Sequence, residues 1–230
     1  MTRGGPQRIP RPAGVQLGGP APWAGLADGG RGIDLDQVRR RLAEAGPAVR
    51  SPREGQVTMA SAVLAPLYES DGATHIILTR RSAALRVHSG EVSFPGGRQD
   101  PGETLADTAR REAFEEVGLD PSSVELVGEL DHLSTFTSNS FIVPYVAVLP
   151  GRPELHPNPG EVDAVLHVPL AELLDPGTFR EEVWSFLGAE RPMWFFELEG
   201  DTVWGATAAM LRQLLGLVTG TVARGAMGHP

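Results

Sequence analysis

Hydrophobic residues recur at helical spacing in three stretches of the chain. Apolar positions three or four residues apart predict helices over residues 34–45, over residues 104–117 and from about Ala206 to Val218. Asp34 is a suitable N-terminal cap for the first helix, and Gly118 is a natural stop for the second. The second helix contains neither proline nor glycine, so the pattern predicts one continuous element there.

Runs rich in β-branched and aromatic residues lie between these helices, bounded by turn residues. They predict strands over residues 57–68, 74–80, 123–131, 140–149, 162–168 and 193–199. Ser70, Asp71 and Gly72 supply the turn between the first two strands. With helices interspersed among them, these strands predict an α/β fold with a mixed sheet.

The two ends of the chain differ from the middle. Residues 1–32 are rich in Gly, Pro and Arg, contain a lone Trp23 and show no periodicity. Such a segment has too little apolar surface to offset an ordering entropy of about 1–2 kcal/mol per residue, which predicts a disordered or loosely attached leader. Residues 33–220 are then expected to form one domain, and residues 221–230 a tail, because 230 residues are ample for one domain and marginal for two.

Composition excludes several kinds of chemistry. The chain has no cysteine, and all 20 of its basic residues are arginine. Disulfides, thiol nucleophiles, lysine Schiff bases and a lysine-dependent phosphate loop are therefore excluded. Residues 54–230 carry 11 Arg against 25 acidic residues, and this acidic body argues against a nucleic-acid partner. No stretch reaches 18 apolar residues and no signal core is visible, so we expect a cytoplasmic protein without a membrane partner.

Residues 97–119, GRQDPGETLADTARREAFEEVGL, carry the most specific pattern in the chain. They fit G-x5-E-x7-R-E-U-x-E-E-x-G-U, where U is an apolar residue, and so resemble the Nudix box. Glu112, Glu115 and Glu116 fall on one side of the predicted helix, where like charges repel each other. The alternative to a metal site is that these glutamates simply form a solvated acidic face of the helix. Hard oxygen ligands on a rigid helix suit a divalent cation, and Mg²⁺ or Mn²⁺ is the cofactor that the resemblance implies.

Residues 78–97, LTRRSAALRVHSGEVSFPGG, resemble the second signature of the coenzyme A pyrophosphatases within the Nudix superfamily. The match to L-T-x-R-S-x3-R-x3-G-x-V-x-F-P-G-G includes Arg81 and Arg86, whose guanidinium groups suit phosphate oxygens. The two resemblances imply a Nudix-type α/β/α sandwich. They also imply metal-dependent hydrolysis of the diphosphate of coenzyme A or its derivatives, giving 4′-phosphopantetheine and 3′,5′-ADP.

The resemblances also imply a role for each site residue. Glu112 and Glu116 are expected to be the principal metal ligands, with Glu115 and the Gly97 carbonyl as further ligands. Glu115, Glu116 and Glu161 are the candidate catalytic acids and bases, and Arg111 is expected to pair with Glu103 and hold the loop of the box. Substrate contacts are expected from Arg81, Arg86, Phe94, Gly96 and Gly97.

Two other functions are compatible with the sequence. One is a Nudix hydrolase that acts on ADP-ribose, NADH or a nucleoside triphosphate, since the lead-in Phe-Pro-Gly-Gly is shared widely. The other is a non-catalytic binding module with the same fold, although no carboxylate of the box is missing here. Taken as isolated residues, Arg81 and Arg86 would be interpreted as surface arginines of a loop. For Glu161 a structural role and a catalytic role are equally compatible with the sequence.

Overall fold

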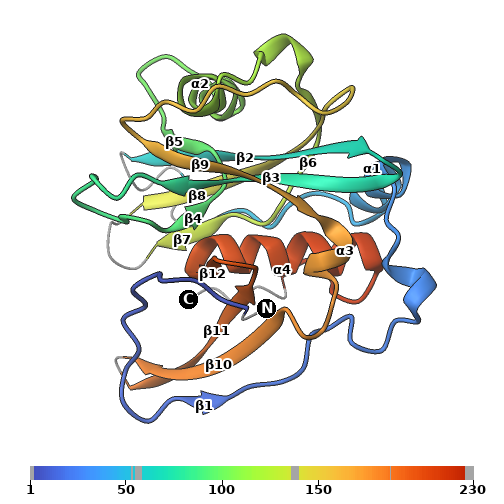
Figure 1. Ribbon diagram of the computed structural model, residues 1–230, viewed down its shortest axis with the longest axis vertical. Coiled ribbons are helices and arrows are strands. Elements are labelled where there is room, and N and C mark those ends of the chain that lie inside the picture. The colour runs from blue at the N-terminus through green and yellow to red at the C-terminus, as the bar shows by residue number, and fades with distance from the viewer. Residues whose placement is uncertain (1–2, 53, 55–58, 136–139, 187, 226–230) are drawn as a thin grey trace.

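The computed structural model describes residues 3–52, 54, 59–135, 140–186 and 188–225. Its elements are stacked in layers (Figure 1). Helix α2 (Leu105–Val117) covers one face of an eight-stranded sheet, and helix α4 (Gly205–Thr219) covers the other. A four-stranded sheet packs on the far side of α4. The α/β/α sandwich that the sequence predicts is therefore confirmed, with a further sheet beneath it.

The eight-stranded sheet is mixed. Strand β2 (Ala60–Ser70) runs parallel to β8 (Ser140–Val148), whereas its pairs with β3 (Ala73–Arg81) and β5 (Gly96–Arg98) are antiparallel. The remaining strands are antiparallel to their partners. They are β4 (Val92–Ser93) and β9 (Val162–Pro169) beside β3, and β6 (Glu125–Glu129) and β7 (Leu133–Thr135) beside β8.

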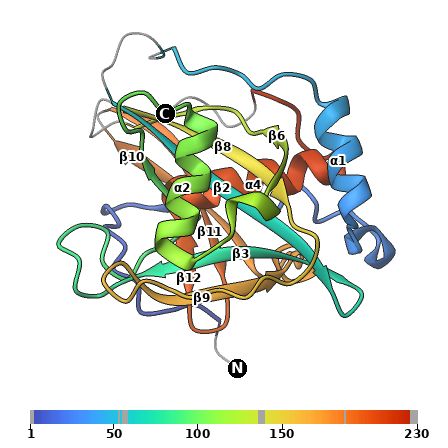
Figure 2. The same cartoon turned by 90° about the horizontal axis from the view of Figure 1, so that it is seen from above.

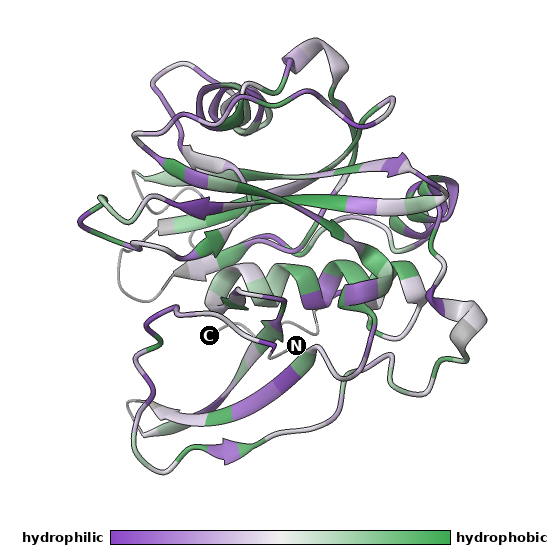
Figure 3. Cartoon of the chain, in the orientation of Figure 1, coloured by the Kyte–Doolittle hydropathy of each residue, from purple (hydrophilic) through white to green (hydrophobic). Residues whose placement is uncertain are grey.

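Side chains of the central strands alternate between two cores, as a strand buried on both faces requires. In β2, Leu64 and Tyr68 pack in the core beneath α2, while Ala65 and Leu67 pack in the core around α4. Figure 3 shows apolar residues along the strands between the two helical layers. Helix α1 (Leu35–Glu44) adds Leu35, Val38 and Leu42 to the α4 core and lies at the end of that helix, as Figure 2 shows.

Local signals explain where α2 begins and ends. Thr104 caps its N-terminus by accepting the Asp107 N–H at 3.1 Å. At the other end Gly118 adopts the left-handed conformation, with φ of 71°, and its N–H bonds back to Phe114. Among the described residues, none of the helices has both the length and the apolar character needed to cross a bilayer.

The four-stranded sheet is less evident in the sequence. It is ordered β1 (Gln16–Leu17), β10 (Phe179–Phe186), β11 (Ala189–Glu197) and β12 (Thr202–Trp204). The sequence predicts a strand over residues 193–199, which covers only the second half of β11, and predicts no strand at β10. Short elements complete the fold: the 3-10 helices Asp28–Arg31 and Pro121–Ser123 and helix α3 (Leu170–Leu173).

Within residues 3–32 the leader is packed against the domain, and this corrects, for those residues, the prediction of a disordered or loosely attached segment over residues 1–32. Trp23 is fully buried, with its ring 5.4 Å from Phe179 and 6.1 Å from Phe196. The backbone of β1 pairs with β10, and Arg3 forms a 2.5 Å ion pair with Asp175. The leader adds little apolar surface in total. One large aromatic side chain, placed in an aromatic core, together with strand pairing is enough to fix it.

Candidate active site

Two glycines bring strand β5 close to both β2 and helix α2. A Cβ atom on Gly96 would lie 2.4 Å from the Ala62 carbonyl oxygen, so the strand pairing there leaves no room for a side chain. A Cβ atom on Gly97 would lie 2.5 Å from the Glu112 carboxylate. Gly97 therefore lets a carboxylate of α2 rest directly against the backbone of the strand.

Glu112 and Glu116 lie one helical turn apart on α2 and both face this backbone. Glu116 as a whole is only 3% exposed, and one of its side-chain oxygens accepts the Gly96 N–H at 3.3 Å. Burial raises the pKa of Glu116 to about 7 against the partial compensation of Gly96 and Arg81. Burial also raises the pKa of Glu112. The positive charge near these buried carboxylates is too small to offset the cost of burying their negative charge.

Glu161 contributes a third negative charge to the same place. Its charge raises the pKa values of both Glu112 and Glu116, although it lies in a different segment, just before β9. The backbone fixes this segment: the Asn158 N–H donates to the Glu116 carbonyl oxygen at 2.8 Å, and the Ser82 N–H donates to the Glu161 carbonyl oxygen at 2.8 Å. Three chain segments thus meet at the acidic group.

Asn158 was not singled out by the sequence analysis. The signal for it lies in the Asn-Pro-Gly triplet at residues 158–160, which is typical of a turn. The Asn158 carbonyl oxygen accepts the N–H groups of Glu161 and Val162, at 3.0 and 2.8 Å, and so starts the strand that follows. The triplet marks where the loop tightens, but the sequence does not reveal that the same turn is bonded to α2.

Arg111 connects the loop of the box to its helix. Its guanidinium Nε donates to Glu103 at 2.7 Å, and one terminal nitrogen donates to the Arg98 carbonyl oxygen at 3.0 Å. The ion pair predicted between Arg111 and Glu103 is therefore present. The Arg111 bond is the main reason why the pKa of Glu103 falls to about 2. The other terminal nitrogen of Arg111 donates to Glu112 at 3.0 Å and to Glu115 at 2.9 Å, leaving the Glu115 side chain 52% exposed.

The residues expected to contact substrate differ in how exposed they are and in how close they lie to the acidic group. Arg81, at the end of β3, lies 3.7 Å from Glu116, with its side chain 28% exposed. Arg86 is exposed on the loop of residues 82–91. Phe94 does not fit the expectation of a substrate contact: it is 2% exposed and belongs to the core around α4. Phe94 lies between β4 and β5, and its side chain is turned into that core together with that of Val92, whereas the adjoining Gly96 and Gly97 are partly exposed.

The oxygen donors at this site fit a divalent cation. Among the described residues, no three Asp, Glu or His side chains are grouped closely enough to hold a metal ion by themselves. Mg²⁺ does not need such a cage, because it commonly takes one or two carboxylates and fills its remaining positions with water and substrate phosphates. The two closely placed carboxylates of Glu112 and Glu116, whose pKa values burial raises, are compatible with such a site.

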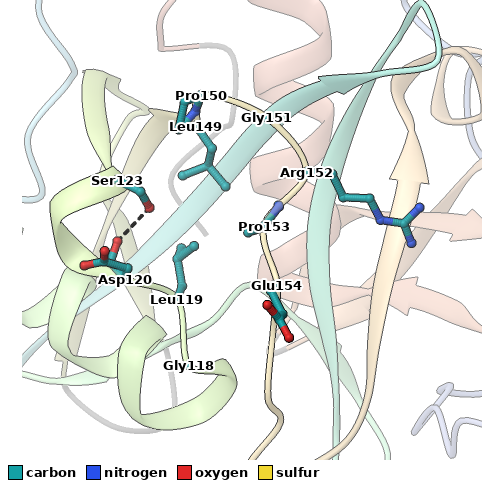
Figure 4. Close-up of a pocket in the computed structure, with 10 residues that line it drawn as sticks. All are labelled: Gly118, Leu119, Asp120, Ser123, Leu149, Pro150, Gly151, Arg152, Pro153 and Glu154. Atoms are coloured by element: carbon teal, nitrogen blue, oxygen red, sulfur yellow. Dashed lines mark hydrogen bonds between the residues drawn. The ribbon is translucent and has the colours of Figure 1, made fainter.

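A separate cavity of about 410 Å³ lies at the C-terminal end of α2 (Figure 4). It is lined by residues 118–120, Ser123 and the loop of residues 149–154. Figure 4 shows the Arg152 side chain directed away from Asp120, while the Ser123 hydroxyl donates to the Asp120 carbonyl oxygen at 2.7 Å. None of the expected site residues lines this cavity, so it is distinct from the acidic group.

Comparison with known proteins agrees with this geometry. A family model described as the NUDIX domain matches residues 58–187. The chain is 37% identical over 155 residues to the uncharacterised Nudix hydrolase NudL of Photorhabdus laumondii, covering 67% of this chain and 82% of that protein. It is 33% identical over 190 residues to NudL of Klebsiella pneumoniae, covering 82% and 96%.

More distant or longer proteins also match. Nudix hydrolase 3 of Caenorhabditis elegans is 41% identical over 134 residues, and the chain spans 56% of that relative's length. The crystal structure of the Nudix hydrolase RenU of M. smegmatis superposes with a TM-score of 0.46 at 19% identity, covering 71% of this chain and 86% of that one. The family model covers more than half of the chain, and the Klebsiella relative is matched over nearly its whole length. The chain therefore belongs to the Nudix hydrolases, which are pyrophosphatases that act on small nucleotide derivatives with divalent cations.

Proposed function

We propose that this enzyme hydrolyses the diphosphate of coenzyme A or its derivatives to 4′-phosphopantetheine and 3′,5′-ADP. The observation that carries the proposal is the position of the coenzyme A signature relative to the box. Arg81 of the signature lies 3.7 Å from Glu116 of the box, and Ser82 is bonded to the backbone of Glu161. The proximity of these two signature residues to the acidic group supports the proposal.

Glu112, Glu116 and the Gly97 carbonyl are the groups that would hold a divalent cation, Mg²⁺ or Mn²⁺, with Glu115 as a supplementary ligand. When bound, the cation neutralises anionic phosphate oxygens and makes water a better nucleophile. The chain itself contributes the rigid placement: Gly96 fixes one oxygen of Glu116, and Arg111 fixes one oxygen of Glu112. Ligands held in this way lose little entropy when substrate arrives.

Of the two candidates we choose Glu161 as the general base. The Glu115 carboxylate accepts a 2.9 Å bond from Arg111, is half exposed and acts by its charge on Glu112, whereas the charge of Glu161 acts on both Glu112 and Glu116. In the proposed step the oxygen of water attacks one phosphorus of the diphosphate. The bond from that phosphorus to the bridging oxygen breaks, and the Glu161 carboxylate takes the proton of the water.

Arg81 and Arg86 are proposed to bind the phosphates of the substrate. A guanidinium carries five N–H donors, so Arg81 can balance Glu116 and still donate to a phosphate oxygen. Arg86 is exposed on the loop of residues 82–91, where it is accessible to the 3′-phosphate that coenzyme A carries besides its diphosphate. The leading alternative, another nucleotide diphosphate such as ADP-ribose, lacks this 3′-phosphate and gives the arginines less to bind.

Steady-state kinetics on coenzyme A, 3′-dephospho-coenzyme A and ADP-ribose test this proposal. Glu112→Gln and Glu116→Gln should each lower kcat by about a hundredfold or more, because a carboxylate essential to cation binding is lost. Glu190→Gln, a change to an exposed glutamate of the four-stranded sheet, is the matched control and should behave like the wild type.

Specificity is tested by the same kinetics. The wild type should prefer coenzyme A to its 3′-dephospho form by about ten- to a hundredfold in kcat/KM, as expected for an arginine–phosphate contact. Arg86→Ala should reduce that ratio mainly by slowing the 3′-phosphorylated substrate. An outright preference for ADP-ribose would contradict the proposal that coenzyme A is the substrate. Near-wild-type activity of both glutamine variants would contradict the proposal that Glu112 and Glu116 bind the cation.

A further inference from the structure

The N-terminal segment of residues 3–7 lies along the turn between β11 and β12. The Gly4 N–H donates to the Leu198 carbonyl oxygen at 2.7 Å, and the Gly5 N–H donates to the Thr202 hydroxyl at 3.0 Å. In Figure 1 the start of the chain runs beside β12 and continues toward the left of the view. This segment precedes the region matched by the Nudix family model, which begins at residue 58.

Gln7 uses its whole side-chain amide at this junction. Its nitrogen donates both to the Gly90 carbonyl oxygen at 3.2 Å and to Asp201 at 2.8 Å. Its oxygen accepts the Thr202 N–H at 2.8 Å. One glutamine therefore joins the turn at Asp201 to Gly90, which belongs to the loop of residues 82–91.

Gly90 is bonded directly to the backbone of Arg81. The Gly90 N–H donates to the Arg81 carbonyl oxygen at 3.2 Å, and the Arg81 N–H donates to the Glu91 carbonyl oxygen at 2.9 Å. These two bonds close the loop at its base, where Arg81 leaves β3. Holding the Gly90 carbonyl therefore restrains the backbone from which the Arg81 guanidinium reaches Glu116.

Asp201 restrains the preceding residue as well. It is 2% exposed and accepts two bonds from Arg80, at 2.8 Å from Nε and at 2.6 Å from a terminal nitrogen. Two parallel bonds of this kind fix the direction of a guanidinium as well as its distance. Arg80 is thus held toward the turn at Asp201, while the neighbouring Arg81 reaches Glu116 of α2, at a point where the pairing of β3 with β9 is irregular.

We propose that Gln7 and Asp201 are positioning residues that set the orientation of Arg81 and of the loop of residues 82–91 for substrate binding. Neither touches the proposed reacting groups, so their effect passes through Gly90, Arg80 and the backbone of Arg81. The inference rests on the proposed function, because Arg81 is taken there as a phosphate ligand. It assigns the N-terminal segment a role in substrate binding in addition to its role in packing.

The isosteric variant Gln7→Glu separates positioning from packing. It has the same shape, but its carboxylate cannot donate to Gly90 and adds a negative charge beside Asp201. We expect roughly a tenfold rise in KM with kcat within about twofold of the wild type, since one or two hydrogen bonds are lost. Gln7→Ala should give a similar or smaller rise. Gln16→Ala, a change to an exposed glutamine of the same leader, is the matched control and should leave both constants unchanged.

A double-mutant cycle with Arg81→Ala is the decisive experiment. If Gln7 acts through Arg81, the effect of Gln7→Glu on kcat/KM should largely vanish in the Arg81→Ala background. Effects that multiply independently would overturn the inference, and so would an unchanged KM in Gln7→Glu.

Hydrogen–deuterium exchange provides a readout that needs no substrate. Gln7→Glu should speed exchange in residues 82–91 while exchange in α2 stays as in the wild type. Unchanged exchange in that loop would overturn the inference even if the enzyme hydrolyses coenzyme A. A third outcome separates the two proposals: exchange becomes faster only in that loop, but the protein hydrolyses none of the tested diphosphates. This outcome would contradict the proposed function and would still support the positioning role of Gln7.

Discussion

Replacing Glu116 by glutamine should stabilise the metal-free protein at neutral pH while it abolishes activity. Glu116 is 3% exposed, and burial raises its pKa to about 7 from an ordinary value of 4.5. The folded state therefore keeps its proton to a higher pH than the unfolded chain does. As pH rises from about 4.5 through about 7, the wild type must carry a charge that the fold disfavours, and its stability falls. Glutamine resembles the protonated acid and avoids this loss.

The size of the effect follows from the same two values. A difference of one unit between the folded and unfolded pKa values corresponds to about 1.4 kcal/mol in the free energy of unfolding. The pKa values of about 7 and 4.5 therefore limit the stability that the wild type loses above pH 7 to about 3 kcal/mol. Glutamine can still accept the Gly96 N–H through its amide oxygen, so that bond adds no opposing loss. We expect a gain of about 1–3 kcal/mol at pH 8, or roughly 3–10 °C in Tm. At pH 4 we expect almost no gain.

Thermal unfolding of chelator-treated wild type and Glu116→Gln, followed from pH 4 to pH 8, measures this directly. Glu115→Gln is the control, because that carboxylate is half exposed and bonded to Arg111, and it should show no gain. Millimolar Mg²⁺ should then raise the Tm of the wild type more than that of Glu116→Gln. A gain that does not change with pH, or a variant less stable than the wild type at pH 8, would refute the reasoning.

Three further predictions concern other parts of the structure. Trp23→Ala should lower the free energy of unfolding by about 3–5 kcal/mol, because Trp23 fills an aromatic core; a loss below 1 kcal/mol in chemical denaturation would show that the leader packs weakly. Arg111→Ala should return the pKa of Glu103 from about 2 toward 4.5, measured by NMR titration of the carboxyl carbon; an unchanged low pKa would remove Arg111 as its cause. Gly97→Ala should lower kcat at least tenfold while Tm changes little, because the new Cβ displaces the flexible end of Glu112; unimpaired turnover would contradict that contact.

The elements that the sequence predicts well are those whose pattern is local. The box helix is predicted within one residue of the observed Leu105–Val117, because its apolar spacing lies within it and its cap and terminal glycine directly flank it. Five strands of the large sheet, β2, β3, β6, β8 and β9, are predicted within about three residues for the same reason, whereas the short strands β4, β5 and β7 are not predicted. The acidic face of Glu112 and Glu116 also follows from spacing alone.

What the sequence does not predict depends on contacts between distant segments. Strand β10 has polar residues at four of its eight positions. Its Glu181 accepts a bond from Trp194 of β11, and its Glu182 pairs with Arg11 of the leader. The burial of Trp23 depends on aromatic residues more than 150 positions away. The inward orientation of Phe94 depends on which face of the sheet α4 covers, which the signature motif does not encode.

The same distinction applies to the site. The sequence identifies Arg111 and Glu103 as a pair because both lie in the box, eight residues apart. It leaves Glu161 open, because the proximity of that residue to Glu112 and Glu116 arises from the loop that returns across α2. Gln7 and Asp201 carry no motif at all. Their contacts with each other span 194 positions, and a single sequence offers no pattern at that range.

Mass-spectrometric identification of the products formed from coenzyme A in the presence of Mg²⁺ tests the central claim most directly. Cleavage of the diphosphate should yield 4′-phosphopantetheine and 3′,5′-ADP in equal amounts, and in ¹⁸O-labelled water one of the two should carry a single labelled oxygen. The Glu116→Gln protein should form neither product at a comparable rate. Intact coenzyme A under conditions in which ADP-ribose is cleaved, or release of the 3′-phosphate in place of diphosphate cleavage, would contradict the proposal.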